Sequence, residues 1–239
     1  MIQDLKRKIV QAVYDAKEGH IASAFSILDI LWVLYKEILR PEDRFILSKG
    51  HASLALYAIL GLDMRDFGKY NSFLGGHPDR RKAPGVVAST GSLGHGLPIA
   101  VGMALARKIK GSMGRVFCLV GDGECNEGAI WEACLLATHH KLNNLWLIVD
   151  SNHSSDRAVR LENMIQKFQS FGFGVEQIDG HDQSAIANSL KYPIWRQDAP
   201  HAVIAETTKG NGCERRRESE WHHKIPNEID LSEILEELS

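Results

Sequence analysis

Apolar residues along this chain follow two alternating patterns, which predict helices and strands in turn. Near the start, Ile2, Leu5, Ile9 and Val13 recur at helical spacing and predict a helix with one buried face. Further on, short apolar runs such as 116–120 are typical of strands buried on both faces. The predicted helices cover 2–16, 27–39, 53–60, 97–109, 128–139, 161–171, 183–190 and 231–238. The predicted strands cover 44–47, 116–120, 145–149, 174–178 and 201–205.

The order of these elements predicts the fold class. Strands that alternate with helices form a parallel sheet with helices on both faces, so we expect an α/β fold. Ser26 and Asp29 form a capping-box pattern that predicts the start of the helix over 27–39, and Pro41 ends it. The segment 61–84 has little periodicity and is predicted to be mostly loop. No internal repeat or linker interrupts the pattern, so residues 1–239 are interpreted as a single domain.

Polar residues follow two of the predicted strands directly. Gly121, Asp122 and Gly123 come after the strand over 116–120, and Asn152 comes after the strand over 145–149. In an open α/β sheet, ligands bind where strands end. Asp122 and Asn152 offer the oxygen ligands that Mg²⁺ or Ca²⁺ takes, while the glycines let the backbone approach a phosphate. Asp122 could instead cap the following helix, but its spacing to Asn152 favours a metal–diphosphate site.

These residues and several other motifs resemble one family of enzymes. Gly121-Asp122-Gly123 followed by Asn152 is similar to the thiamine diphosphate fingerprint, and 121–128 with Trp131-Glu132-Ala133 is similar to its transketolase version. The other matching motifs are Gly19-His20, Ser48-Lys49-Gly50-His51-Ala52, Gly76-His77-Pro78, Ser89-Thr90-Gly91-Ser92-Leu93-Gly94, Gly180-His181-Asp182, Thr208-Lys209-Gly210 and Trp221-His222-His223-Lys224-Ile225-Pro226-Asn227. They are collinear over nearly the whole chain. The resemblance implies the thiamine diphosphate-binding fold, as in the diphosphate-binding (PP) domain that comes first in full-length transketolase.

The resemblance also implies contacts to a metal and a cofactor. Asp122, Asn152 and a backbone carbonyl near Ser154 would coordinate Mg²⁺ or Ca²⁺. The backbone N–H of Gly123 would point at the diphosphate of thiamine diphosphate, and the backbone of Leu93 would contact its aminopyrimidine ring. The residues implied in cofactor binding are His51, Gly91, Ser92, Leu93, Gly121, Asp122, Gly123, Glu124, Asn152 and His223.

Five residues are implied in catalysis. His20 and His77 match histidines that contact the sugar hydroxyls, while His51 and His223 match histidines that contact the diphosphate or line the substrate channel. Glu127 matches a glutamate of an inter-subunit carboxylate network. Neutral imidazoles suit such a channel because they exchange protons near neutral pH and can hydrogen-bond hydroxyl groups.

The histidines also have structural interpretations. His20 and His77 each follow glycine in predicted loops, where exposed histidines are common, and His51 could cap the following helix. Between the neighbours His222 and His223, the spacing to Pro226 favours His223 as the functional one, and a zinc site from both is not favoured. The other histidines, interpreted as structural, are His139 and His140 at a helix end, His153, His181 and His201.

The chain departs from the family pattern at several places. The segment after His20 reads Ile21-Ala22-Ser23, without the usual proline and glycine, and His95 and Asn126 each replace a usual glutamine. The loop over 152–159 is the largest departure, because it lacks the usual apolar residue and Asp-Gly pair. This loop borders the implied metal and could mark a specialised substrate.

Two groups that transketolase chemistry needs are not found in this sequence. These are the glutamate that activates the aminopyrimidine ring and the residues that hold the substrate phosphate, which in the family belong to the second domain. The resemblance therefore implies the N-terminal subunit of a split transketolase that moves a two-carbon ketol unit from a ketose phosphate to an aldose phosphate. Its partner would be a C-terminal subunit carrying the pyrimidine-binding domain, and the assembly a heterotetramer with two copies of each chain.

Other functions remain as alternatives. The chain could be half of a transketolase-like enzyme of a specialised biosynthetic pathway, with another donor or acceptor, or a non-catalytic relic of the fold. Deoxyxylulose-phosphate synthase is less favoured, because that enzyme lacks equivalents of Glu127 and Trp221-His222-His223. A nicotinamide-dependent enzyme is disfavoured because no G-x-G-x-x-G follows a strand with an acidic residue about 20 positions on.

Composition narrows partners and location. The net charge is −2 and the pI about 6.6, which gives no nucleic-acid footprint. The run 215–217 of three arginines has acidic neighbours and is interpreted as a solvated loop. Four cysteines without C-x-x-C spacing suggest buried thiols in a reducing cytoplasm. The sequence starts as an amphipathic helix rather than a signal peptide, and no apolar run is long enough to span a membrane.

Overall fold

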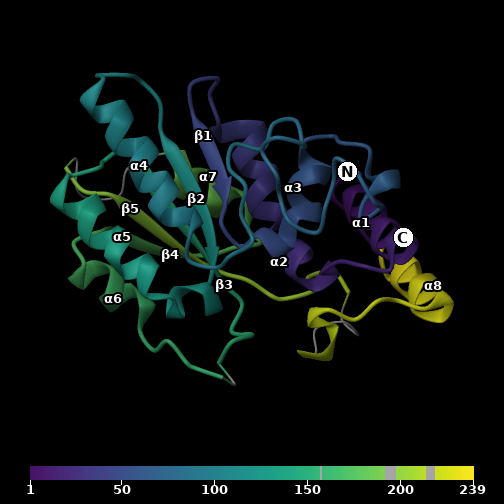
Figure 1. The fold of residues 1–239 in the computed structure, drawn as a ribbon. Coiled ribbons are helices and arrows are strands. Elements are labelled where there is room, and N and C mark those ends of the chain that lie inside the picture. Colours follow the sequence, from purple (N-terminus) through teal and green to yellow (C-terminus); the bar gives the residue numbers. More distant parts are fainter. Residues whose placement is uncertain (157, 192–197, 214–218) are drawn as a thin grey trace.

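The computed structural model describes residues 1–156, 158–191, 198–213 and 219–239, which fold around a five-stranded sheet (Figure 1). All pairs of neighbouring strands are parallel, and the order across the sheet is β1-β2-β3-β5-β4. The strands are β1 (Arg44–Leu47), β2 (Val116–Gly121), β3 (Leu145–Ser151), β4 (Gly174–Asp179) and β5 (His201–Glu206). The predicted parallel α/β sheet is confirmed, and the carboxyl ends of all five strands meet at one edge.

Successive residues of the strands face two separate hydrophobic cores. In β2, Phe117 and Leu119 pack into one core, and Cys118 and Val120 into the other. The first core includes α1 (Ile2–Ala16), α2 (Ile21–Val33), α3 (Ser53–Ile59), α7 (Gln183–Lys191) and α8 (Glu228–Glu237). The second core includes α4 (Gly96–Ile109), α5 (Gly128–His139) and α6 (Met164–Ser170), which lie together on one side of the sheet in Figure 1. Burial on both faces explains why the strands read as continuous apolar runs.

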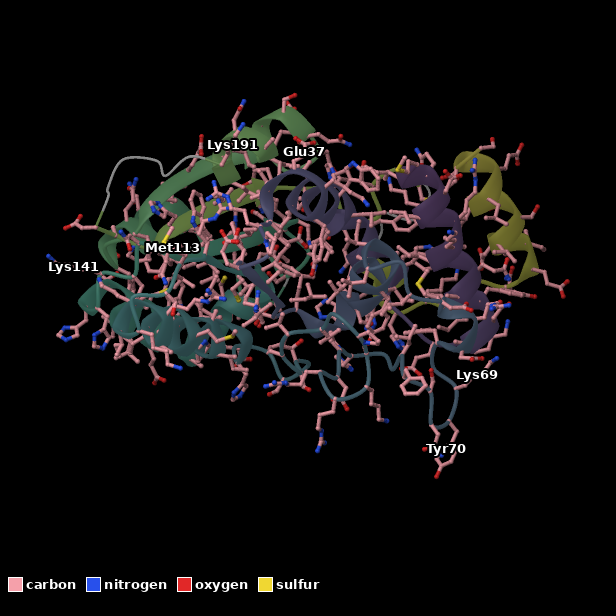
Figure 2. The ribbon with its side chains drawn as sticks, turned by 90° about the horizontal axis from the view of Figure 1, so that it is seen from above. Glu37, Lys69, Tyr70, Met113, Lys141 and Lys191 are labelled. Atoms are coloured by element: carbon pink, nitrogen blue, oxygen red, sulfur yellow. The ribbon has the colours of Figure 1, made fainter. Side chains whose placement is uncertain are left out.

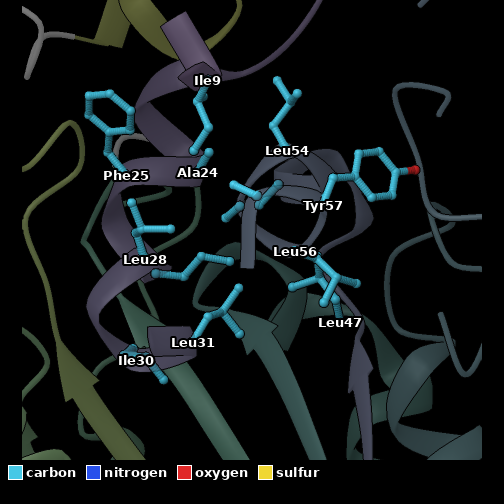
Figure 3. Close-up of a cluster of buried hydrophobic side chains, with 14 of the residues drawn as sticks. Ile9, Ala24, Phe25, Leu28, Ile30, Leu31, Leu47, Leu54, Leu56 and Tyr57 are labelled. Carbon is cyan, nitrogen blue, oxygen red and sulfur yellow. The ribbon is translucent and has the colours of Figure 1, made fainter. Parts of the chain in front are cut away.

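The first core continues beyond the sheet between α1, α2 and α3. Ile9, Phe25, Leu28 and Leu54 are almost fully buried there (Figure 3). Tyr57 is also fully buried, and its hydroxyl group points away from this cluster in Figure 3. This hydroxyl lies 3.1 Å from each of the carbonyl oxygens of Gly75 and His77. The core therefore anchors the loop that carries His77.

The start of α2 differs from the prediction. The helix begins at Ile21 rather than at residue 27, and it continues into a π-helical turn over Leu34–Ile38. Ser26 and Asp29 do not form a capping box. The Ser26 hydroxyl bonds to Asp150 across 2.7 Å, and Asp29 lies 3.0 Å from His181. The prediction was wrong because both polar side chains are buried and bond to distant parts of the chain, which a local pattern cannot reveal.

The connecting segments mostly follow the prediction. The segment 61–84 is largely loop, with one short 3₁₀ turn at Met64–Asp66. Lys69 and Tyr70 lie at a tip that projects far from the sheet when the molecule is viewed from above (Figure 2). The last helix, α8, starts earlier than predicted, at Glu228, behind a capping box formed by Asn227 and Asp230. The arginine run 215–217 lies outside the described residues.

Two predictions from composition can be compared with the structure. All four cysteines are buried, and none forms a disulfide among the described residues, so the predicted buried thiols are confirmed. Burial raises the pKa of Cys134 to about 12 and the pKa values of Cys118 and Cys125 well above their ordinary value. Of the helices described, none combines the length and apolar character needed to cross a bilayer.

One buried histidine couples the stability of the sheet to pH. His201 begins β5, is fully buried, and packs on the Trp146 ring with centroids 4.5 Å apart. Neither ring nitrogen has a hydrogen-bond partner in the described structure. Burial lowers the pKa of His201 to about 4. Because the unfolded chain binds this proton more readily, the stability due to neutral His201 is present above the ordinary histidine pKa and is lost as the pH falls towards about 4.

We expect His201→Phe to reduce the acid sensitivity of folding. Between pH 6.5 and 4, the free energy of unfolding of the parent chain should fall by about 2–3 kcal/mol more than that of the variant. Urea unfolding followed by circular dichroism at several pH values measures the difference. His139→Phe, at the exposed end of α5, is the matched control and should keep the parent profile. Identical pH profiles for His201→Phe and the parent would contradict this account.

Candidate functional site

A cavity of about 390 Å³ lies at the carboxyl edge of the sheet, where four strands end together. The segments following β1, β2, β3 and β5 each contribute to its wall. The lining residues are Ser23, Lys49, His51, Leu93, Gly121, Asp122, Gly123, Glu124, Asn152, Ser154, Ser155, Lys209 and His222. The cavity therefore brings together eight of the predicted site residues.

A buried ion pair lies behind the cavity. Lys49 follows β1 and Asp150 lies near the end of β3, and both side chains are almost completely buried. The Lys49 ammonium group bonds directly to Oδ2 of Asp150. Burial alone would raise the pKa of Asp150, but the Lys49 charge and hydrogen bonds from Lys49, Thr207 and Ser26 lower it overall. A pair this well satisfied can remain charged in a low-dielectric interior.

Asp150 also fixes the neighbouring segments. Its Oδ2 accepts hydrogen bonds from Ser26 of α2 at 2.7 Å and from the Asn152 amide at 2.9 Å, and its Oδ1 accepts one from Thr207 after β5. Because the Asn152 amide nitrogen is held by Asp150, its carbonyl oxygen is directed elsewhere. That oxygen lies 3.1 Å from the backbone nitrogen of Ser154, at the cavity wall.

The two carboxylate oxygens of Asp122 have different surroundings. Its Oδ1 accepts a hydrogen bond from the backbone N–H of Gly123 at 2.7 Å, which caps the 3₁₀ turn Gly123–Asn126. Its Oδ2 is buried and has no hydrogen-bond partner in the described structure. Burial raises the pKa of Asp122, opposed by the Gly123 N–H. A buried carboxylate oxygen without a donor fits a bound cation, so one oxygen of Asp122 caps the turn while the other is available to a metal.

The protein alone supplies few metal ligands. Within the described residues, no three side chains of His, Cys, Asp or Glu are grouped so that they could hold a metal ion. Asp122, the amide of Asn152 and the backbone near Ser154 would leave several positions open on Mg²⁺. Such an incomplete shell suits a cation whose other ligands come from a phosphate group. The residues present therefore fit a metal held together with a diphosphate.

Glu124 joins three segments of the cavity wall. Its Oε1 accepts hydrogen bonds from the Ser48 hydroxyl and from the backbone N–H of Gly94 at 2.8 Å, and its Oε2 accepts one from Gly121 N–H at 3.2 Å. Burial raises the pKa of Glu124, opposed by these donors. Both carboxylate oxygens are thus already bonded to protein groups. The geometry places Glu124 in the cavity wall, where it holds the segments that would meet a cofactor.

Four histidine rings gather at one end of the cavity. The ring of His20 lies 5.2 Å from that of His51, 5.3 Å from that of His222 and 4.6 Å from that of His223. Burial, followed by neighbouring histidine and lysine groups, lowers the pKa of His20 to about 3 and that of His51 to about 2. These two imidazoles are therefore neutral at physiological pH. They can hydrogen-bond hydroxyl groups without adding positive charge.

The structure places the neighbours His222 and His223 differently. His222 lines the cavity and lies 2.6 Å from the Lys209 ammonium, whereas His223 packs against His20 outside the cavity lining. The spacing to Pro226 favoured His223, but it does not specify the direction of the short 3₁₀ turn Ser219–His222, which decides which side chain faces the cavity. The role of His223 itself stays a prediction.

The remaining predicted residues surround the cavity. His77 is exposed, and its ring lies so close to Gly91 that a Cβ there would come within 2.8 Å of it; Gly91 also has φ +148°. Glu127 is exposed at the start of α5, and a Cβ on Gly94 would come within 2.7 Å of its side chain. Close packing therefore demands glycine at both positions. Ser92 is exposed beside Leu93, which is 38% exposed at the cavity wall.

The atypical loop after Asn152 forms a second cavity wall. His153 adopts φ 59°, and its Nε2 lies 2.8 Å from Glu206, with Asp156 near its other ring nitrogen. A cavity of about 390 Å³ on this side shares Asp122 with the first cavity. The side-chain bond of Glu206 is the leading reason that the pKa of His153 is raised. His153 thus ties the loop to the end of β5.

His181 positions the loop after β5. Its Nδ1 lies 3.0 Å from Asp29, and its Nε2 accepts a hydrogen bond from the backbone N–H of Thr208 at 2.8 Å. The structural interpretation of His181 agrees with these contacts. Through Thr208 the contact also fixes the neighbouring Lys209.

Sequence reasoning gave no role to three charged residues that the structure places at the site. Lys49 and Lys209 line the cavity, and Asp150 lies directly behind it. A signal was present, because Lys49 and Lys209 belong to the matching motifs Ser48-Lys49-Gly50-His51-Ala52 and Thr208-Lys209-Gly210, and Asp150 stands two residues before Asn152. Their charges become informative only once the strand ends are brought together.

Comparison with known proteins identifies related chains. Residues 1–234 match the family model described as transketolase, thiamine diphosphate binding domain. One of the separate subunits of apulose-4-phosphate transketolase from Phocaeicola vulgatus is 35% identical over 98% of this chain and 91% of the relative. The 6-deoxy-6-sulfo-D-fructose transketolase subunit of a Clostridium species is 34% identical over 82% of this chain and 78% of the relative.

Solved structures give the same family. Transketolase from Campylobacter jejuni superposes with a TM-score of 0.88 at 32% identity, covering 99% of this chain and 41% of that chain. Transketolase from Leishmania mexicana superposes with a TM-score of 0.86 at 26% identity, covering 98% of this chain and 40% of that one. The chain therefore spans about two fifths of these solved transketolases, while it matches most of the length of the separate subunits.

We expect Asp150→Asn to destabilise the chain by about 3–5 kcal/mol, because it leaves the Lys49 ammonium buried without a counter-charge. Urea unfolding at pH 7 measures the loss. The double variant Lys49→Met with Asp150→Asn removes both charges and should recover a large part of it. A loss below about 1 kcal/mol for Asp150→Asn, or no recovery in the double variant, would contradict the importance of the pair.

Proposed function

The chain belongs to the transketolase family as a thiamine diphosphate-binding, N-terminal transferase subunit, and we propose that it works in a split transketolase as a single diphosphate-binding domain. It would hold thiamine diphosphate and Mg²⁺ at the cavity on the carboxyl edge of the sheet. A second chain would supply the pyrimidine-binding domain. Together they would transfer a two-carbon ketol unit from a ketose phosphate to an aldose phosphate.

The single observation that carries the proposal is Oδ2 of Asp122, which is buried after the end of β2 and has no hydrogen-bond partner in the described structure. It lines the same cavity as Asn152, whose amide nitrogen bonds to Asp150. These two groups, with the backbone near Ser154, would coordinate Mg²⁺. Lys49 and Lys209 in the cavity wall would supply the positive charge that an anionic diphosphate requires, whereas the backbone N–H of Gly123, predicted to point at the diphosphate, donates to Oδ1 of Asp122 in this structure. When bound, the cofactor supplies the carbanion chemistry of ketol transfer.

The residues of this chain would orient and protect the reacting groups. Neutral His20 and His51 can hydrogen-bond sugar hydroxyls, and the His223 ring lies beside that of His20, while His77 packs against Gly91. Leu93 offers an apolar surface at the cavity wall. Glu127, exposed at the start of α5, is available to a neighbouring chain.

The cavity lacks the group that activates the cofactor. The carboxylates in its lining are Asp122 and Glu124, and both Glu124 oxygens already bond to the protein. Within the described cavity wall, no further carboxylate is free to meet an aminopyrimidine ring. This supports the requirement for a partner chain, and a heterotetramer with two copies of each chain is the assembly that we propose.

A specialised substrate is the second candidate function. By their names, two relatives act on apulose-4-phosphate and on 6-deoxy-6-sulfo-D-fructose. The unusual loop, tied down by His153 and Glu206, and the second histidine at position 223 favour a donor or acceptor other than the common sugar phosphates. His223 lies beside the histidines where sugar hydroxyls would bind, and the loop lines the cavity on the other side of Asp122.

The proposed function can be tested by isolating the tagged chain from its own cells with its bound partner. We expect the purified chain alone to show no ketol transfer, and the reconstituted pair to transfer a ketol unit in the presence of thiamine diphosphate and Mg²⁺. A panel of ketose phosphates, non-phosphorylated ketoses and sulfonated ketoses would separate the two candidate functions. Robust turnover by the chain alone, or no cofactor binding by the pair, would overturn the proposal.

We expect Asp122→Asn to weaken cofactor binding without reducing the stability of the metal-free chain. The pKa of Asp122 is raised by burial, so its contribution to the stability of the metal-free chain is present below the ordinary aspartate pKa and is lost as the pH rises through the raised value. At pH 7 the variant should therefore match the metal-free parent or exceed it by about 1 kcal/mol.

The same variant should weaken Mg²⁺-dependent binding of thiamine diphosphate to the pair by more than about tenfold. Calorimetric titration measures the binding, and urea unfolding measures the stability. Asp63→Asn, at an exposed and remote aspartate, is the matched control. Parent-like affinity in Asp122→Asn would remove Asp122 from the metal site.

A further inference from the structure

A lysine and a histidine from different segments meet inside the cavity wall. Lys209 follows β5 and is 7% exposed, and His222 ends the 3₁₀ turn Ser219–His222. The Nζ atom of Lys209 lies 2.6 Å from Nδ1 of His222, so the two groups form a hydrogen bond. Both residues line the cavity together with Lys49 and Asp122.

This contact restricts where His222 can carry its proton. An ammonium group has three donors and no acceptor, so the ring nitrogen that faces it must be unprotonated. A neutral imidazole carries one N–H, and with Nδ1 excluded that N–H lies at Nε2. Partial burial and then the Lys209 charge lower the pKa of His222 to about 4, so the neutral form is the relevant one.

We propose that Lys209 is a positioning residue that holds His222 in its Nε2–H tautomer and so provides the cavity with a neutral hydrogen-bond donor. With the opposite tautomer, Nε2 would present a lone pair, which repels an anionic oxygen. This effect, called here the tautomer lock, requires only the contact between the Lys209 and His222 side chains. Its use on a diphosphate oxygen rests on the proposed function.

The surrounding residues explain why a lysine suits this task. His181 holds the backbone N–H of Thr208, which fixes the neighbouring Lys209. The rings of His20 and His51 lie 5.3 Å and 5.7 Å from that of His222, and both are neutral. Neither ring determines which nitrogen of His222 carries the proton. Burial lowers the pKa of Lys209 to about 8, so at pH 7 Lys209 is still mainly the charged, donor-only group that determines it.

Nuclear magnetic resonance of the full chain with ¹⁵N-labelled histidine tests the lock directly. Long-range ¹H–¹⁵N spectra at pH 7 distinguish a protonated from an unprotonated ring nitrogen, and loss of signals in His222→Gln assigns the residue. We expect unprotonated Nδ1 and protonated Nε2 in the parent chain. A parent His222 in the Nδ1–H form, or doubly protonated, would overturn the proposal.

Three substitutions at Lys209 test whether its donor-only character, and not its contact alone, determines the tautomer of His222. Lys209→Arg remains donor-only and should keep the Nε2–H form. Lys209→Gln can donate or accept, and Lys209→Met can do neither, so both should shift the Nδ1 resonance towards a mixture of tautomers. A pure Nε2–H form in both Lys209→Gln and Lys209→Met would contradict the lock. Unchanged signals from buried His201 confirm that each variant is folded.

Thiamine diphosphate and Mg²⁺, added to the labelled chain with its unlabelled partner, test the use of the donor. We expect the Nε2 resonance of His222 to shift on binding in the parent and in Lys209→Arg. Binding without any response at His222 would overturn the diphosphate assignment alone. No binding at all would instead overturn the proposed function, while the tautomer measured in the free chain would still decide the lock.

Discussion

The buried ion pair between Lys49 and Asp150 is the interaction on which the site depends. It joins the segment after β1 to the end of β3, and through Ser26 and Thr207 it also connects α2 and the segment after β5. Removing two charges from water costs several kcal/mol for each ion, and the cost is offset only when every donor and acceptor is used. Asp150 meets this condition, with four donors on two oxygens. The same geometry holds the amide nitrogen of Asn152, so the ion pair also positions the side chain that we propose as a metal ligand.

The fold places this pair where it is useful. Parallel strands bring all their carboxyl ends to one edge, and two hydrophobic cores cover the faces, so the edge is where polar groups can gather. Asp122 is an exception, because one of its buried carboxylate oxygens has no hydrogen-bond partner in the described structure. An unbonded buried oxygen is unfavourable in the metal-free chain, and the cation of the proposed function would satisfy it.

Much of the fold could be predicted from the sequence, because strands buried on both faces read as apolar runs and the helices between them keep their period. The start of α2 could not. Ile21 to Val33 is buried on nearly every side, and Ser26 and Asp29 look like caps although they bond to Asp150 and His181, which are distant in the sequence. Local patterns report local energies, and these two side chains are determined by distant partners.

The candidate site was predictable to a different degree. Asp122 and Asn152 were found because each stands directly after a strand, and the structure brings both to the cavity. Lys49 and Lys209 were not assigned, since lysines are common on surfaces and only burial reveals their importance. The sequence favoured His223, whereas His222 is the one of the pair that lines the cavity, because the direction of a short turn is set by what it packs against. Here that is the wall around Lys209 and His20.

The buried thiols add a practical property to the two-core arrangement. Cys118, Cys125 and Cys134 lie in the core beside α4, α5 and α6, while Cys213 lies in the other core. Thiolates are the reactive form, so burial and raised pKa values keep the first three inert towards alkylating reagents in the folded chain. The rate at which each cysteine is alkylated therefore measures how often its own side of the sheet opens. A single labelling time course, read by mass spectrometry, would tell whether the two halves of this domain open together or one before the other.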